Sequence, residues 1–315
     1  CSISALNMTY RRFGLIRLAY PLDVTNLSSP NWPRRDCKSN AVSDPNSDQV
    51  TAAAFATSWN SLSSGSVYTY DQFRDWLAPL TKQDVLGQSV LELGCGNGSL
   101  MRHSLDWQPK HLHGIDLGES VRSARANLSQ TRYTNWTVEQ ADLVAYRSEG
   151  FDLVYCIGVL HHLQNPEAGF RAVVANVRPG GRLHCWVYAK EGNRLVILLV
   201  EPIRKIASKL PWRVNKYLVA APLALFFFFY AKILAKAVPH KVFSRFPMYS
   251  YCRWIAKRGF SFFHHVVFDQ LVTPQTEYLE RSTIENWLED SRIDPSSTYI
   301  LMRNGNSWKF GGRVT

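Results

Sequence analysis

Cysteine is scarce in this chain, and no two cysteines have the spacing of a metal or redox pair. Six cysteines are spread over 315 residues without a CxxC motif. Neither a disulfide-stapled secreted domain nor a zinc module is therefore indicated. Cys95, Cys156 and Cys185 lie inside apolar, strand-like runs, where cysteine behaves as a small buried hydrophobic residue. We expect a reduced, cytoplasmic setting.

The chain also lacks an apolar run long enough for a confident membrane span, which needs about 20 residues. Its most apolar run, 217–231, carries no charge over 15 residues, but Lys216 and Lys232 bound it and Pro222 interrupts it. Two interpretations remain open. The run is either a helical lid that packs on a sheet domain, or an interfacial hairpin that dips into the inner face of a membrane.

Acidic residues are nearly absent from residues 190–260. This segment holds fourteen lysines and arginines against Glu191 and Glu201, a net +12, whereas the whole chain is +11, so the rest is about −1. Its aromatic residues cluster in apolar blocks, unlike a base-stacking groove, so we do not expect a nucleic-acid partner. Residues 200–245 could instead contact an anionic membrane surface. The basic side chains for that contact are Arg204, Lys205, Lys209, Arg213, Lys216, Lys232, Lys236 and Lys241.

Apolar runs alternate with helical stretches from about residue 88. The expected strands are 89–95, 111–117, 136–142, 151–158 and 182–188, with helices at 98–105, 119–129 and 166–177. This alternation predicts a Rossmann-like, doubly wound α/β fold with a mostly parallel, seven-stranded sheet. The last two strands, 297–303 and 307–313, follow a helix at 283–291.

The same pattern predicts the domain boundaries. We expect a loose N-terminal arm over 1–50, the Rossmann-like core over 51–189, a helical, basic and aromatic insertion over 190–265, and completion of the sheet over 266–315. The chain opens with Cys1 rather than Met. We expect a partial reading frame, with a lipidated mature N-terminus as the alternative.

A glycine-rich turn follows the first strand of this core. Gly94 and Gly96 have no Cβ, so the backbone can turn tightly and a ligand can approach it closely. The next helix offers free N–H groups suited to an anion such as a carboxylate. Glu92, at the end of the strand, suits a ligand ammonium group.

Two further acids follow the next two strands. Asp116 lies 18 residues beyond Gly98, where an acid in dinucleotide folds binds ribose hydroxyls, and Asp142 is placed to accept from an adenine amino group. A dinucleotide turn reads GxGxxG, whereas here the glycines are 94, 96 and 98. Glu92 would repel a pyrophosphate. These residues therefore favour adenosine joined to an amino acid.

Five motifs in order, ELGCGNG, GIDL, AD, FDLVYCIGVLHHL and NVRPGGRL, resemble class I S-adenosylmethionine-dependent methyltransferases over roughly 88–190. They are most similar to the broad small-molecule and lipid-type group that includes quinone-biosynthesis methyltransferases. The resemblance implies S-adenosyl-L-methionine as cofactor. It also implies these cofactor-binding residues: Glu92, Gly94, Cys95, Gly96 and Gly98 at the methionine end, Asp116 at the ribose, and Leu117, Asp142, Leu143 and Ile157 around the adenine and the fourth strand.

Candidate catalytic residues are His161 and His162, which follow the fourth strand and could orient or deprotonate a substrate. Either histidine could instead serve packing. We expect no metal site there, because adjacent histidines without nearby acids are a poor ligand set. Asp269 and Tyr278, after the insertion, are candidate substrate contacts, with surface hydrogen bonding as the alternative.

The sequence thus predicts a methyltransferase that acts on an oxygen, nitrogen or carbon atom of a small, partly hydrophobic or lipid-like acceptor. Two rival functions stay open. One is a catalytically silent, cofactor-binding module at a membrane, and the other is a nicotinamide-dependent oxidoreductase. The sequence names neither the acceptor nor the oligomeric state.

Overall fold

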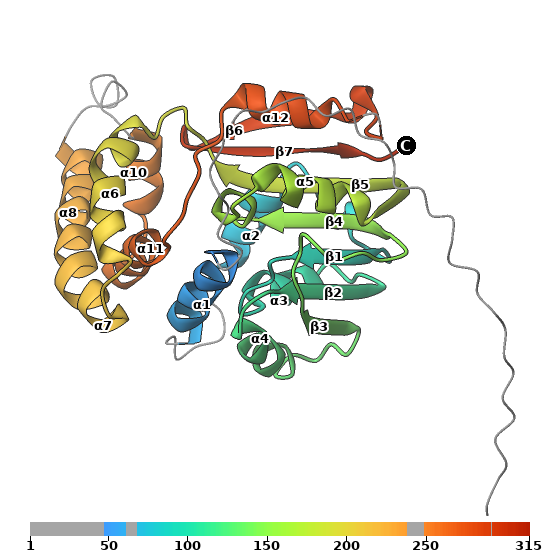
Figure 1. The fold of residues 1–315 in the computed structure, drawn as a ribbon, viewed down its shortest axis with the longest axis horizontal. Helices are drawn as coiled ribbons and strands as arrows, with labels where there is room; N and C mark the ends of the chain where they lie inside the picture. The colour runs from blue at the N-terminus through green and yellow to red at the C-terminus, as the bar shows by residue number, and fades with distance from the viewer. Residues whose placement is uncertain (1–46, 61–67, 238–248, 291) are drawn as a thin grey trace, which may run out of the picture. The chain divides into compact units, whose positions relative to one another are not determined.

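The computed structural model describes residues 47–60, 68–237, 249–290 and 292–315. The arm expected over 1–50 lies outside the described residues up to residue 46. The predicted α/β fold is confirmed. Seven strands form one sheet in the order β3-β2-β1-β4-β5-β7-β6, drawn in Figure 1. The strands are β1 Ser89–Leu93, β2 His111–Asp116, β3 Trp136–Gln140, β4 Phe151–Ile157, β5 Val177–Tyr188, β6 Tyr299–Arg303 and β7 Ser307–Arg313.

The sheet is mostly parallel, as predicted. Strands β3, β2, β1, β4 and β5 pair in parallel, while β7 pairs antiparallel with both β5 and β6. The order of strands reverses beside β1, where the chain moves first to β2 and β3 and then back to β4 on the other side. Ligands of open α/β sheets bind outside the carboxyl ends of the strands at such a switch point.

Alternating side chains of the strands bury two faces of the sheet. In β4, Val154 and Cys156 enter one hydrophobic core while Leu153, Tyr155 and Ile157 enter the other. Such period-two burial on both faces is typical of a sheet covered by helices on each side. Cys95, Cys156 and Cys185 are buried with free thiols, as the apolar runs predicted.

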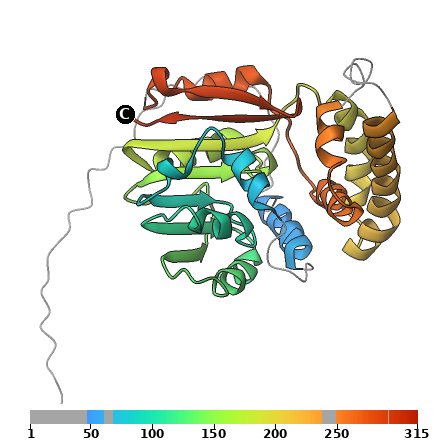
Figure 2. The ribbon, with the colours of Figure 1, turned by 180° about the vertical axis from the view of Figure 1, so that it is seen from behind.

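Helices cover both faces, as the views from front and back show (Figures 1 and 2). One face packs against α5 Pro166–Ala175 and α12 Arg281–Leu288 through Phe170, Val173, Ile284 and Trp287. The other packs against α2 Tyr70–Leu77, α3 Ser99–Leu105 and α4 Ser120–Leu128. These bounds lie within two residues of the predicted helices 98–105, 119–129 and 166–177.

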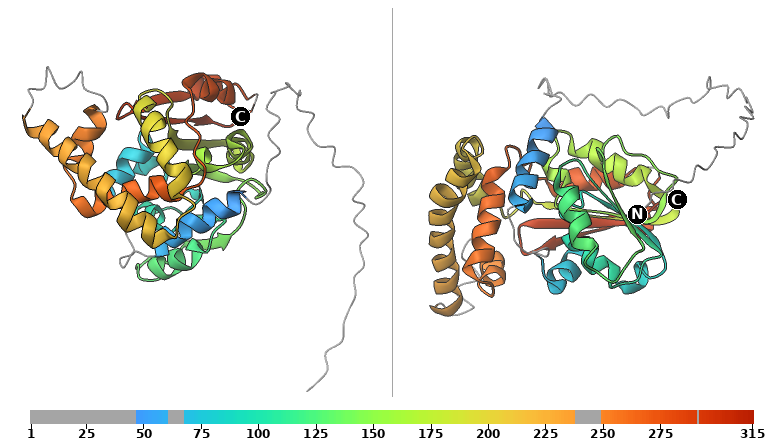
Figure 3. Two further views of the ribbon diagram at one scale, coloured as in Figure 1. Left: turned by 60° about the vertical axis from the view of Figure 1, so that its left-hand side comes forward. Right: turned by 90° about the horizontal axis from the view of Figure 1, so that it is seen from below.

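Between β5 and α12 the chain forms a helical module. Its helices are α6 Arg194–Ala207, α7 Trp212–Val214, α8 Ala221–Ala237, α10 Tyr249–Ile255 and α11 Phe260–Val272, with a π-helical turn Asn215–Ala220 joining α7 to α8. Helix α11 packs against both α6 and α8, and it lies between α8 and the sheet (Figure 3). The insertion was expected to end at residue 265, but α11 continues to Val272 because its apolar face stays buried through Leu271 and Val272.

One long apolar helix in this module runs further than the sequence indicated. Trp212–Ile233 has the length and composition to cross a membrane, among the residues that the structure describes, and 22% of its most apolar window is buried. Pro222 does not end it; the helix changes from π-helical to α-helical at Ala221, beside the proline, which is where helices accommodate such a break in their hydrogen bonding.

Candidate functional site

A cavity of about 460 Å³ opens at the carboxyl ends of the parallel strands, between the sheet and the helical module. This volume is in the usual range for small-molecule sites. The strands β1, β2 and β4 bring residues to one end of the cavity, and α6, α8, α10 and α11 bring residues to the other. We call these the turn end and the helical end.

The glycine turn forms the wall of the turn end. Gly94 has a φ of +80°, and an added Cβ would lie 2.3 Å from Cγ2 of Val159, so a side chain is excluded by packing. Gly96 has a φ of +52°, and its Cβ would meet nothing within 4 Å. The space beside Gly96 is therefore open to a ligand.

Gly98 has a packing role in the structure. It precedes α3 with a φ of +76°, and an added Cβ would lie 3.2 Å from the backbone of Ala124 in α4. Gly98 does not line the cavity, whereas Cys95 does. Its lack of a side chain therefore lets α3 and α4 pack closely.

Glu92 is a buried carboxyl group at the turn end. It is 2% exposed, and its Oε2 accepts a 2.8 Å hydrogen bond from the hydroxyl of Tyr155, which lies 3.0 Å from Ser104 Oγ. No cation pairs with Glu92 among the described residues. Burial raises the pKa of Glu92 to about 8, although the hydrogen bond from Tyr155 opposes the shift. Such a carboxyl group is suited to a ligand cation.

Asp116 joins the glycine turn to the start of α4. Its Oδ2 accepts from the Gly96 N–H at 2.9 Å, and its Oδ1 accepts from the Gly118 N–H at 2.9 Å and from Ser120 Oγ at 2.8 Å. Burial raises the pKa of Asp116, while these three hydrogen bonds lower it. Asp116 therefore connects the glycine turn to the start of α4 and also lines the cavity.

The remaining predicted cofactor residues lie along the same wall. Leu117, Asp142, Leu143 and Ile157 line the cavity. Asp142 is exposed and accepts from the Val144 N–H at 2.8 Å, and Leu143 is buried beneath it. All predicted cofactor residues except Gly98 are therefore brought to one wall.

Helix α1, Ser47–Asn60, covers the turn end and was not expected to contribute to the site. Its residues Asp48, Thr51, Ala52 and Phe55 line the cavity. Asp48 Oδ1 accepts from the Gln164 N–H at 2.8 Å, which ties α1 to the chain after β4. No motif marks this helix, because its contribution is a covering position and not a chemical pattern.

The two candidate histidines differ in position. His161 is fully buried beneath Tyr188, with ring centroids 4.1 Å apart, and it does not line the cavity. Burial lowers the pKa of His161 well below its usual value. Its imidazole ring is therefore neutral at physiological pH and packs in the core. The geometry therefore gives His161 no direct contact with a ligand.

His162 does line the cavity. Burial lowers its pKa to about 4. Nδ1 lies 3.0 Å from the carbonyl oxygen of Gln275, so we assign the proton to Nδ1 and a lone pair to Nε2. Phe55 of α1 packs edge-on against the ring at 5.0 Å. His162 is thus held in one orientation with an acceptor nitrogen.

Both candidate substrate contacts line the cavity as well. Asp269 of α11 lies 3.2 Å from His265 Nε2. The Tyr278 hydroxyl accepts from Arg204 Nη2 at 3.2 Å, and Arg204 Nε donates to the Gln270 carbonyl at 2.7 Å. Arg204, expected to face lipid, is instead 1% exposed and pairs with Glu201 at 2.7 Å. It fixes the helical module to the segment that carries Tyr278.

The helical end is apolar and aromatic. It is lined by Val196, Leu199, Val200, Leu223, Phe226, Phe227, Tyr230, Tyr251, Trp254, Phe262, Phe263, Val266 and Val267. Leu199 and Phe226 also have half or more of their surface exposed, at 53% and 67%. The helical end therefore reaches the exposed surface of α6 and α8.

Two tryptophans that the sequence did not mark lie between the two ends. Trp76 and Trp186 line the cavity, their rings are 5.7 Å apart, and each indole N–H is buried without a hydrogen-bond partner in the described chain. Trp186 lies near the carboxyl end of β5 and pairs with Ile157, the last residue of β4. The sequence signal available for Trp186 was its position near the carboxyl end of a predicted strand, whereas no sequence signal indicated a site role for Trp76.

Comparisons with known proteins bear on this site. Residues 91–183 match the family described as "Methyltransferase domain". Ubiquinone biosynthesis O-methyltransferase of Aeromonas salmonicida is 26% identical over 47% of this chain and 64% of its own length. The enzyme of that name from Neisseria meningitidis is 30% identical over 45% and 62%. The chain spans less than two thirds of the curated relatives it matches, 28% of one and 64% of another.

Among solved structures, magnesium protoporphyrin IX methyltransferase of Synechocystis is 17% identical over 80% of this chain and 84% of its own, with a TM-score of 0.45. The family match covers β1 through the middle of β5 and stops before the helical module. The family predicted from the motifs is thereby confirmed for this segment, and with it S-adenosylmethionine as the cofactor of the domain.

Proposed function

We propose that this chain, whose residues 91–183 form a class I S-adenosylmethionine-dependent methyltransferase domain, methylates a small, largely hydrophobic acceptor. The observation that carries the proposal is the continuity of the cavity. Its turn end offers carboxylates and a bare backbone, and its helical end offers aromatic and aliphatic walls. A polar donor and an apolar acceptor would therefore meet inside one cavity.

The residues of the turn end fit the cofactor. Glu92 is a buried carboxyl group that needs a cation, and the ammonium of the methionine moiety is one. The open space beside Gly96 admits a ligand against the backbone. Asp116 is placed for ribose hydroxyls and Asp142 for the adenine amino group, with Leu117 and Leu143 beside them.

When bound, S-adenosylmethionine would supply a methyl group on a positively charged sulfur for transfer to the acceptor. The chain contributes orientation, since the walls at Ile157 and Trp186 flank the passage between the two ends. Orientation of reacting groups alone can lower a barrier by about 7–11 kcal/mol. A hydroxyl acceptor also loses a proton, and His162 lines the cavity as a neutral ring whose low pKa, about 4, suits it to accept a hydrogen bond from that hydroxyl rather than to keep its proton, which leaves to solvent.

We also propose that the acceptor arrives from an anionic membrane surface. Exposed apolar side chains of α6, α8 and the π-helical turn before α8 alternate along the chain with exposed cations: Leu198, Leu199, Ile206, Leu218, Leu225, Phe226, Phe229 and Ile233, with Lys205, Lys209 and Arg213. Apolar residues flanked by lysine and arginine are typical of interfacial helices. Leu199 and Phe226 belong both to this face and to the cavity wall, so a lipid-like acceptor would enter there.

The deciding experiment has two stages. Calorimetry with S-adenosylhomocysteine measures the affinity of the turn end, and we expect one site per chain. Membrane-lipid and metabolite extracts are then incubated with a donor that carries a deuterated methyl group, and mass spectrometry seeks acceptors that gain it. The Gly96→Arg protein, whose added side chain fills the space beside the glycine turn, is the negative control. Nucleoside binding without a labelled product in any extract would favour a silent module, and NADH binding without nucleoside binding would favour an oxidoreductase.

A further inference from the structure

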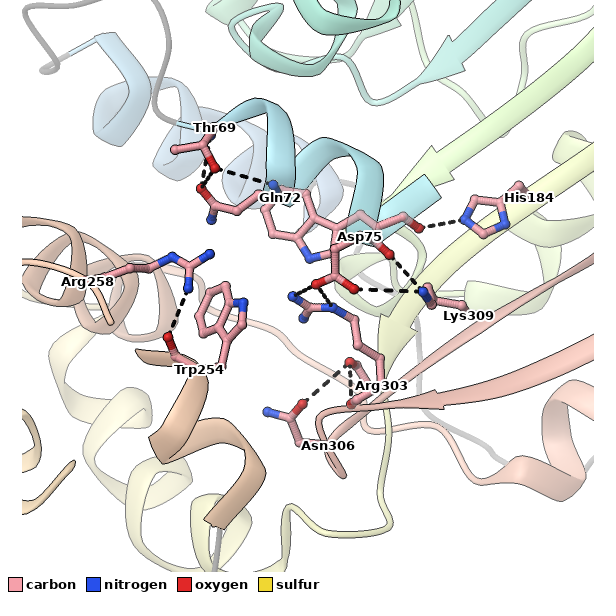
Figure 4. Close-up of polar contacts among 11 residues, drawn as sticks. Thr69, Gln72, Asp75, His184, Trp254, Arg258, Arg303, Asn306 and Lys309 are labelled. Carbon is pink, nitrogen blue, oxygen red and sulfur yellow. Dashed lines mark hydrogen bonds and ion pairs between the residues drawn. The ribbon is translucent and has the colours of Figure 1, made fainter. Parts of the chain in front are cut away.

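An arginine lies on the cavity wall at the helical end. Arg303, at the end of β6, is 7% exposed and lines the cavity. Its Nε donates to Asp75 Oδ2 at 2.7 Å, and its Nη2 bonds the same oxygen. Lys309 Nζ also donates to the Asp75 carbonyl at 2.7 Å and lies 3.9 Å from Asp75 Oδ1 (Figure 4). The Asp75 carboxylate thus interacts with two cations, Arg303 and Lys309.

A third cation belongs to the same cluster. The Arg258 guanidinium carbon lies 3.8 Å from the centre of the Trp254 ring, and that of Arg303 lies 5.2 Å from the same ring. Figure 4 shows the Trp254 indole between the two arginines. No acidic side chain pairs with Arg258 among the described residues, and its Nη1 donates to the Trp254 carbonyl. We call Asp75, Arg258, Arg303 and Lys309 the Arg303 cluster, which carries a net charge of about +2 at neutral pH.

Hydrogen-bond donors next to the cluster are left without acceptors. Gln72 is 1% exposed, and its Oε1 accepts from the N–H of Thr69 at 3.0 Å, but its Nε2 has no partner in the described chain. In Figure 4 the Gln72 amide nitrogen is turned to the side of Arg258. The buried N–H of Trp76 on the cavity wall is likewise unpaired. Buried donors normally have acceptors, so this set indicates a missing anion or oxygen.

The cluster lies at a definable separation from the place of methyl transfer. Ile157 pairs with Trp186, Trp186 pairs with Lys309, and β7 pairs with β6, which carries Arg303. Neighbouring strands are about 4.8 Å apart, so two to three strand spacings place the cluster roughly 10–14 Å from the end of β4. An acceptor that reached both places would carry its anionic group at that distance from the methylated atom.

We propose that the Arg303 cluster binds an anionic group, a carboxylate or a phosphate, at the remote end of the hydrophobic acceptor. This rests on the proposed function, because it concerns the acceptor half of the same cavity. The Asp75 carboxylate holds Arg303 in place without neutralising the cluster, and Trp254 orients both arginines. The unpaired N–H of Trp76, which lines the cavity, supplies a neutral donor. The cluster therefore selects an amphiphile over an uncharged lipid.

The test compares three ligands that share one tail: dodecanoate, dodecyl phosphate and dodecanol. Their affinities are measured by calorimetry with the full chain, with and without saturating S-adenosylhomocysteine. Hydrogen bonds to charged groups contribute about 1.5–3 kcal/mol, so we expect at least one anion to bind roughly ten to a hundred times more tightly than dodecanol. The better of the two anions identifies the headgroup.

Arg258→Gln and Arg303→Gln should each remove most of this preference. Arg253→Gln, an exposed arginine on α10 with the same change of charge, is the matched control and should keep it. Arg258→Gln leaves the Asp75 ion pairs intact, so it decides the matter if Arg303→Gln does not fold. Equal binding of all three ligands, or a preference that survives in folded Arg258→Gln, would overturn the proposal. Failure of S-adenosylhomocysteine to bind would instead overturn the proposed function, since the anion preference is also measured without it.

Discussion

The two ends of the cavity are built in opposite ways. The turn end is made mostly of main chain and short polar side chains that follow β1, β2 and β3, in the single stretch from Glu92 to Leu143, and α1 covers it. The helical end is made of large apolar side chains brought together from α6, α8, α10 and α11. A turn that holds its ligand by backbone geometry tolerates few substitutions, whereas an apolar wall needs only suitable volume. The family match covers the glycine turn and the acids after β2 and β3, and it ends before the helical module.

The ends also differ in charge. Buried carboxyl groups at the turn end, Glu92, Asp116 and Asp48, all have raised pKa values because burial disfavours their charged forms. At the other end, burial lowers the pKa of Lys309 and Arg258. Each end thus favours a ligand of the opposite sign. The methyl donor is cationic at its ammonium and sulfur, and the proposed acceptor is anionic at its remote end.

The largest expected effect comes from filling the turn end. Gly96→Arg places a long side chain in open cavity space, so we expect affinity for S-adenosylhomocysteine to fall more than about a hundredfold, the equivalent of roughly 2.7 kcal/mol. Calorimetry measures it. Gly180→Arg is the matched control, since Gly180 also has a positive φ, +79°, and open space for a Cβ but does not line the cavity. Full affinity in Gly96→Arg would place the nucleoside elsewhere.

A second substitution set tests whether the exposed apolar side chains of α8 and of the π-helical turn before it contact lipid. Leu218→Glu with Phe229→Glu puts two charges on exposed apolar positions of 72% and 55%. Burial of one such side chain is worth about 1.5–3 kcal/mol, so we expect partitioning onto anionic vesicles to fall roughly thirtyfold or more. Cosedimentation measures it. The pair Leu86→Glu and Leu301→Glu, each 41% exposed on the sheet domain, should bind vesicles like the parent chain. Equal loss in both pairs would mean that charge alone matters.

Sequence reasoning found the sheet and most of the turn end because both depend on local patterns. Strands with period-two burial and a glycine turn followed by acids can be recognised without tertiary contacts. It assigned Gly98 to the ligand, whereas the packing of α3 on α4 explains that glycine. It also treated His161 and His162 alike, although one is buried under Tyr188 and the other lines the cavity.

The helical end was not predictable in the same way. Its residues are up to about a hundred positions apart in the chain, and Arg303, Trp254 and Trp76 carry no motif. Arg204 shows the limit of charge counting, because a basic residue in a basic segment turned out to be buried against Glu201 and Gln270. Only three-dimensional packing distinguishes such an arginine from the exposed Lys205 beside it.

A pH titration tests the electrostatics of the turn end. Glu92 must be ionised to pair with an ammonium, and its pKa in the free chain is about 8. Binding therefore releases a proton below pH 8, and affinity for S-adenosylhomocysteine should fall up to about tenfold for each pH unit below it, then level off above. Glu92→Gln should bind weakly and without this slope. Tyr155→Phe removes a hydrogen bond that lowers the pKa of Glu92. The pH above which the affinity levels off should therefore be higher in this variant.

The smallest expected effect separates the two ends most directly. Phe227 lines the helical end, and Phe227→Ala removes apolar wall without touching the glycine turn. We expect dodecanol affinity to fall about five- to tenfold, while affinity for S-adenosylhomocysteine changes less than about twofold. Phe229→Ala on the same helix is the control, because Phe229 is exposed and does not line the cavity. A parallel loss of both ligands in Phe227→Ala would show that the two ends form a single cooperative site.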